Sequence, residues 1–178
     1  MNTIAIDTTI IRQGLPGITP IAAAQLYEAF EVCMHKSGHA EDVSMEIDGI
    51  SQAIIQIHWE DKFDKQKERT YSDMLYTVEH GAVCLSVLLT KALTPYTIIE
   101  RSRRGTGIDY WLGDNDSVLF QRKARLEVSG ILKGDKTILK KRHTEKTEQV
   151  ARSDDQRIPA YISVVEFGMP MTIFSRKG

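Results

Sequence analysis

The spacing of apolar residues changes from helical to strand-like near residue 94, and this change limits the folds available to the chain. Within 71–93, apolar side chains recur every three or four residues, which predicts a long helix capped by Thr70 with one buried face. Thr94-Pro95 ends this helix, because proline cannot continue it. Alternating or continuously apolar segments then predict strands, at 96–100, 107–112, 119–132, 162–167 and 171–174.

The first third of the chain predicts a helix and a hairpin. We expect residues 1–17 to be irregular, whereas Thr19-Pro20 provides an N-cap and a first helical proline for a helix over 21–36. Segments 43–47 and 52–59 alternate apolar and polar residues around a turn at Asp48-Gly49, which indicates a β-hairpin. The charged residues 60–69 are expected to form a connector or a short helix.

Length and composition are those of a single globular domain, 1–178. Apolar residues make up 42% and charged residues 26% of the chain, so disorder is not expected. The longest apolar run, 81–89, is far shorter than the roughly 20 residues that span a bilayer, and the N-terminus lacks the pattern of a signal peptide. Cys33 and Cys84 are expected to be buried, reduced thiols, and we expect a cytoplasmic protein without membrane contacts.

Charge is distributed unevenly along a chain whose net charge is only -1. Residues 1–60 carry two basic and eight acidic side chains, whereas residues 101–146 carry twelve basic and six acidic ones. A locally basic region is typical of proteins that bind a phosphate-rich partner such as nucleic acid. The same pattern is also compatible with a solvated helix face.

Two neighbouring strands each carry one acid. In 119–132, alternation predicts that Lys123, Arg125, Glu127 and Ser129 share one strand face, and Asp109 lies in the preceding strand. Two adjacent carboxylates are a hard oxygen pair suited to Mg²⁺ or Mn²⁺. The alternative is that both acids form surface ion pairs with Arg125 or Lys123.

The order of the predicted elements resembles a known family. A long helix with an acid is followed by a short strand, a glycine turn, a Gly-x-Asp strand, an acid-bearing strand, a helix and a strand. With the text VEHGAVCLSVLLTKALTPYTIIE, RSRRGTGIDYWLG and KARLEVSGI, this order resembles the core of the PD-(D/E)XK nuclease superfamily, across about residues 71–167. The resemblance implies an α/β fold with a mixed central sheet flanked by helices, a restriction-endonuclease-like core over 70–178. The helix and hairpin within 1–69 would be an N-terminal addition.

The resemblance also implies roles for individual residues. Asp109 and Glu127 would hold Mg²⁺ or Mn²⁺, and Glu79 on the long helix would orient a water or a second metal ion. Lys123, Arg125, Arg103 and Arg104 would contact DNA. Ser129 stands where the family carries its catalytic lysine, and serine has neither the charge nor the basicity of lysine at neutral pH.

Three explanations account for Ser129. The lysine has moved to the basic helix expected at 137–153, where Lys146 is the candidate and Gln149 resembles a helix glutamine of one branch of the family. Alternatively, Lys123 or Arg125 supplies the charge, or the site is inactive. The basic residues of this helix could equally form i,i+4 ion pairs that solubilise its surface.

Three functions follow from these observations. The first is a metal-dependent endonuclease acting on DNA, for example in defence or in a mobile element. The second is a catalytically inactive nuclease-like fold that binds nucleic acid or a protein. The third is a protein-binding subunit or inhibitor that uses the acidic first sixty residues, a region that could also mediate homodimer formation.

Overall fold

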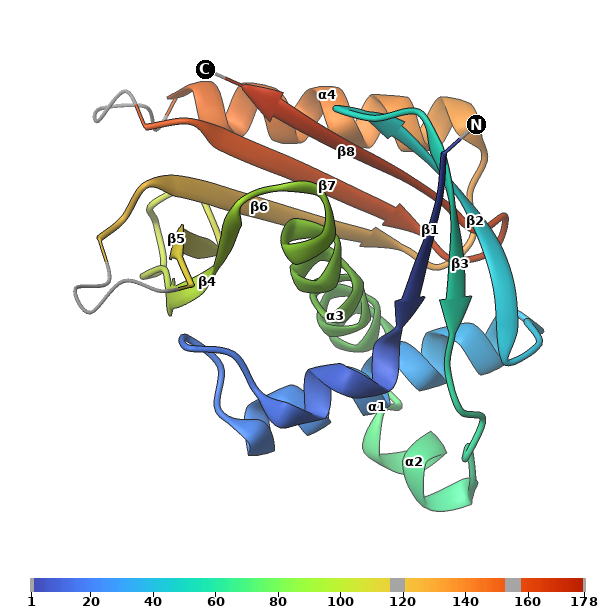
Figure 1. Ribbon diagram of the computed structural model, residues 1–178. Helices are drawn as coiled ribbons and strands as arrows, with labels where there is room; N and C mark the ends of the chain where they lie inside the picture. Colours follow the sequence, from blue (N-terminus) through green and yellow to red (C-terminus); the bar gives the residue numbers. More distant parts are fainter. Residues whose placement is uncertain (1, 116–120, 153–157, 178) are drawn as a thin grey trace.

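The computed structural model describes residues 2–115, 121–152 and 158–177, which form a mixed eight-stranded sheet with helices on both faces (Figure 1). The strand order is β1-β3-β2-β8-β7-β6-β5-β4. The strands are β1 (Asn2–Asp7), β2 (Asp42–Gly49), β3 (Ala53–His58), β4 (Tyr96–Arg101), β5 (Tyr110–Asp114), β6 (Ala124–Ile131), β7 (Ala160–Glu166) and β8 (Met171–Lys177). The helices are η1 (Thr8–Gln13), α1 (Pro20–Lys36), α2 (Lys65–Thr70), α3 (Met74–Leu93) and α4 (Lys136–Arg152).

Two helical layers enclose the sheet. On one face, α1 and α3 bury Phe30 and Leu85 against Met45 of β2 and Leu126 of β6. On the other face, α4 packs Leu139 and Val150 against β7, and Figure 1 shows α4 across the sheet from α3. The α/β class and the mixed sheet flanked by helices are thereby confirmed.

The N-terminal region contains more structure than its sequence indicates. Residues 1–17 were expected to be irregular, but β1 and η1 lie within them. β1 pairs in parallel with β3, so Ile4 lies opposite Ile55, and this pairing joins segments about fifty residues apart. Such a non-local ladder has no local sequence signal, which is why the expectation was wrong. The predicted helix and hairpin are confirmed as α1 and as β2 with β3.

The long helix begins later than its pattern suggests. Thr70 ends the short helix α2, and Asp73 caps α3 by accepting hydrogen bonds from the backbone N–H groups of Leu75 and Tyr76 (3.1 and 3.2 Å). Tyr71 is withdrawn from the helix because its ring is buried and its hydroxyl donates to Glu28 Oε2 (2.9 Å). An aspartate preceding the first turn is a strong N-cap, which favours this later start.

The acid-bearing strands are shorter than expected. β5 starts at Tyr110, so Asp109 immediately precedes it instead of lying inside it, and β6 starts at Ala124. The expected strand residues 119 and 120, like helix residue 153, lie outside the described part of the chain. β6 is covered by α3 on one face and α4 on the other, so its polar face is buried and not exposed to solvent.

The pairing of the C-terminal strands positions the site. β4 and β5 are antiparallel, β5 and β6 are antiparallel, and β6 and β7 are parallel. The parallel pair requires a crossover connection, which α4 provides by running over the face that carries Glu127. In the described residues, no helix is long and apolar enough to cross a membrane. Cys33 and Cys84 are buried free thiols, as predicted.

Candidate functional site

The start of β5 brings Asp109 against Glu127. Tyr110 pairs with Leu126, and the backbone N–H of Asp109 extends this ladder by donating to Leu126 O (2.9 Å). The Asp109 side chain then accepts a hydrogen bond from Val128 N (2.8 Å at Oδ2). The side chains of Asp109 and Glu127 line the same cavity, and each influences the pKa of the other.

Helix α4 completes the arrangement with two side chains one turn apart. Lys146 Nζ donates to Glu127 Oε1 at 2.7 Å, and Gln149 Nε2 donates to the same oxygen at 3.0 Å. Gln149 also contacts Gly107 O (3.3 Å) and accepts from Lys146 (3.3 Å), so it links the helix to the loop before Asp109. Glu127 is 3% exposed, and the lysine side chain is 23% exposed.

Burial changes the protonation of both acids. Loss of solvent raises the pKa of Asp109 above its usual value, against the opposing effects of the Val128 N–H group and the Lys146 charge. Burial, followed by repulsion from Asp109, raises the pKa of Glu127 to about 7, although Lys146 and Gln149 act in the opposite direction. Two buried carboxyl groups that repel each other do not both ionise readily, so burial favours the protonated form of the pair.

The carboxyl pair opens into a basic cavity. This cavity, of about 350 Å³, is lined by both acids, by Lys146 and Gln149, and by the loop that follows β4. Arg101, the last residue of β4, and Arg103 and Arg104 of the loop also line it. A second cavity of about 120 Å³ lies against Asp109 and Lys146 on the side of α3, where Glu79 and His80 line it. Charge and shape therefore suit a phosphate group beside the acids.

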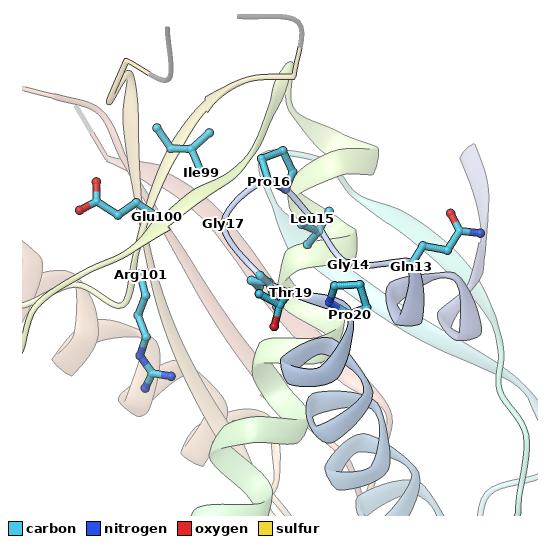
Figure 2. Close-up of a pocket in the computed structure, with 11 residues that line it drawn as sticks. Gln13, Gly14, Leu15, Pro16, Gly17, Thr19, Pro20, Ile99, Glu100 and Arg101 are labelled. Atoms are coloured by element: carbon cyan, nitrogen blue, oxygen red, sulfur yellow. The ribbon is translucent and has the colours of Figure 1, made fainter. Parts of the chain in front are cut away.

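Arg101 borders three cavities and was not among the residues predicted for the site. Besides both cavities at the acids, it lines a groove formed by the 13–20 segment and β4 (Figure 2). There the turn of Leu15, Pro16 and Gly17 lies against the edge strand, and Gly17 N donates to Ile98 O (2.9 Å). Its inclusion in the Arg-Ser-Arg-Arg run was the available sequence signal.

The remaining predicted residues occupy different places. Glu79 is exposed and lines only the smaller of the two cavities at the acids. Arg125 is 3% exposed and donates to Ile158 O (2.7 Å), and Lys123 forms an ion pair with Asp114; neither lines the described cavities at the acids. The Ser129 hydroxyl accepts from Arg142 (3.1 Å) on α4.

The carboxylates of Asp109 and Glu127 fit Mg²⁺ or Mn²⁺, which keep water ligands, better than an ion whose ligands all come from the protein. Within the described residues, no group of three or more His, Cys, Asp or Glu side chains is arranged to hold a metal. Mg²⁺ commonly binds through one or two carboxylates, keeps several waters and uses substrate phosphates. Asp109 and Glu127 beside an open cavity supply that set, whereas zinc would require further nitrogen or sulfur ligands.

Comparisons of this chain with protein-family models, with curated proteins and with solved structures found no match.

Proposed function

We propose that this chain is a metal-dependent nuclease that hydrolyses phosphodiester bonds in DNA. The observation that carries the proposal is the buried Asp109–Glu127 pair, with the Lys146 ammonium 2.7 Å from Glu127, at the base of an arginine-lined cavity. Carboxyl groups whose pKa is raised by burial, in a cavity that also holds a charged partner, mark a candidate functional site.

The order of the elements also supports a restriction-endonuclease-like core. Helix α3, strands β4, β5 and β6, helix α4 and strand β7 follow one another as in the resemblance described above. Asp109 immediately precedes the second of these strands, and Glu127 lies on the third. The positions of the two acids in this order support the proposal, although Asp109 lies just before its strand and not within it.

The lysine position favours a working site over an inactive one. Ser129 cannot provide a charge, but Lys146 reaches Glu127 from α4, which supports the explanation that the lysine has moved to the following helix. Its partial exposure into both cavities allows the ammonium to contact a bound phosphate as well as the acid.

Each residue has a role in the proposed reaction. A bound Mg²⁺ would polarise a phosphoryl oxygen and lower the pKa of a water. Asp109 and Glu127 would hold that ion, and the Val128 N–H group fixes the Asp109 carboxyl by its hydrogen bond. Lys146 would position the attacking water and offset the charge that develops on the phosphate, while Arg101, Arg103 and Arg104 would bind flanking phosphates.

The test is cleavage of labelled DNA by the full chain with Mg²⁺, with Mn²⁺ and with EDTA. We expect cutting that requires metal and that falls by at least about a hundredfold in Asp109→Asn and Glu127→Gln, which remove ligands at little cost in volume. The matched control is Glu46→Gln. Glu46 is a surface carboxylate that pairs with Lys136 (3.2 Å) and lines neither cavity at the acids.

Nucleic-acid binding without cleavage is the competing outcome. Salt-sensitive DNA binding that survives Asp109→Asn, with no cutting under either metal, would replace the nuclease with a binding module. Absence of both binding and cutting would favour the third function, a protein-binding subunit.

A further inference from the structure

An exposed aromatic pair lies on the surface of α3 beside the carboxyl site. The rings of Tyr76 and His80 are stacked, with centroids 3.8 Å apart and an interplanar angle of 27°. Tyr76 is 37% exposed, which makes it the most exposed Phe, Tyr or Trp of the described residues. Leu75, next to Tyr76 in the chain, is 83% exposed, and Ile21 in the first turn of α1 is 86% exposed.

Two hydrogen bonds hold the Tyr76–His80 pair in place. The Tyr76 hydroxyl accepts a hydrogen bond from Gln25 Nε2 of α1 (2.9 Å). His80 Nδ1 lies 2.8 Å from the carbonyl oxygen of Tyr76, which can only accept, so this nitrogen donates. An exposed aromatic pair fixed by polar contacts is preorganised, which lowers the entropic cost of binding a flat ligand.

The aromatic pair starts at the wall of the site. His80 lines the smaller cavity together with Glu79, Asp109 and Lys146. Tyr76 precedes His80 by four residues, which is about 6 Å along a helix axis, so the pair leads away from the acids by one turn. Arg101 lines the same cavity and supplies positive charge there.

We propose that Tyr76 and His80 stack against an unpaired base next to the phosphate bound at Asp109 and Glu127. Bases present a π-face to an aromatic ring only when they are not stacked inside a duplex. The combination of an aromatic surface with arginines fits a base and its phosphates. The substrate class is therefore single-stranded DNA or a frayed or flapped end. Gln25 of the N-terminal addition contributes to this preference by holding the Tyr76 ring through its hydrogen bond.

This inference rests on the proposed function, yet its test needs no cleavage. The full chain is titrated in EDTA into an oligonucleotide carrying 2-aminopurine, as a single strand and as a blunt duplex. Stacking quenches this base, and anisotropy of an end label reports binding. We expect tighter binding to the single strand, with quenching.

Three variants distinguish the effect of the Tyr76 ring on binding from the effect of any exposed apolar side chain. Tyr76→Ala should weaken single-strand binding about tenfold, change duplex binding less than about twofold and abolish quenching. Tyr76→Phe keeps the ring and should retain most of both signals. Leu75→Ala, an exposed neighbour without a ring, should behave as the unaltered chain, and circular dichroism checks that every variant is folded.

Several results would overturn the inference. Equal losses in Tyr76→Ala and Leu75→Ala would indicate an apolar surface for a protein partner, and equal losses for single strand and duplex would exclude base stacking. If the chain cuts DNA with metal but Tyr76→Ala leaves single-strand binding and quenching unchanged, the stacking inference is refuted and the nuclease proposal stands. Stacking without cutting would refute the nuclease alone, and failure to bind either DNA would refute both.

Discussion

Lys146 Nζ donates a 2.7 Å hydrogen bond to Glu127 Oε1, across 19 residues that include the turn from β6 into α4. The lysine is one turn before Gln149, which donates to the same oxygen. Because α4 crosses over from β6 to the parallel strand β7, its inner face is held above Glu127. The geometry thereby links an acid on a strand to a cation on the next helix.

Removing the Lys146 charge should abolish most of the proposed activity. We expect Lys146→Met to lower cleavage by about a hundredfold or more, since a group that orients water or steadies phosphate charge contributes about that much. Single-turnover cleavage with excess Mg²⁺ is the measurement. Lys141→Met, an exposed lysine of the same helix, is the control, and equal activity of both variants would remove Lys146 from the mechanism.

Stability should fall as pH rises toward neutrality. The pKa of Glu127 is raised to about 7 in the folded chain from 4.5, so the folded state binds a proton that the unfolded state has released. This contribution is fully present below about pH 4.5 and is lost as pH rises through about 7, with a slope of up to ~1.4 kcal/mol per pH unit. The raised pKa of Asp109 acts in the same direction.

Urea unfolding from pH 4.5 to 8 measures this effect. Glu127→Gln should flatten the profile in that window, because its amide does not titrate, and Mg²⁺ should flatten it by favouring the ionised pair. Glu79→Gln, at the exposed wall of the smaller cavity, is the control. A profile that is unchanged in Glu127→Gln would show that this acid is not the titrating group.

Under the proposed function, loss of Arg101 should weaken DNA binding, because Arg101 lines both cavities at the acids and would contact phosphate there. We expect Arg101→Ala to reduce affinity for all sequences alike and to lower the slope of log affinity against log salt by about one. Fluorescence anisotropy of labelled DNA, titrated at salt concentrations between about 50 and 200 mM, measures this slope. Lys123→Ala is the matched control, because Lys123 pairs with Asp114 and does not line the cavities. A salt slope that stays the same in Arg101→Ala would place the phosphates elsewhere.

A second buried carboxylate should matter for stability and not for activity. Glu166, 1% exposed, accepts hydrogen bonds from the backbone N–H groups of Gly134, Gly168 and Met169 (2.9, 2.9 and 2.6 Å). Glu166→Ala should lower the free energy of unfolding by about 1–3 kcal/mol, because it leaves buried donors without a partner. Urea unfolding measures the loss, and an unaltered midpoint would contradict this role.

The local sequence determined much of the fold and named much of the site. Apolar periodicity and caps determine α1, α3, α4 and the β2–β3 hairpin, since these depend on neighbouring residues. Strand alternation also predicted that Asp109 and Glu127 lie on neighbouring strands, whereas Lys146 was offered by the family resemblance. The start of α3 was placed too early, because the pattern does not reveal that Tyr71 is buried outside the helix.

Only the tertiary structure decided features that depend on distant segments. β1 exists through its pairing with β3, which closure of a fifty-residue connection makes possible. Alternation alone left Arg125 and Lys123 as equal candidates for the site, but α4 covers β6, so Arg125 is buried on Ile158 and Lys146 takes the place beside Glu127. The sequence by itself singled out Asp109 and Glu127, because the strand patterns around these two acids are local. Which cation meets them was decided by the crossover of α4, because that contact depends on how a helix packs over the sheet.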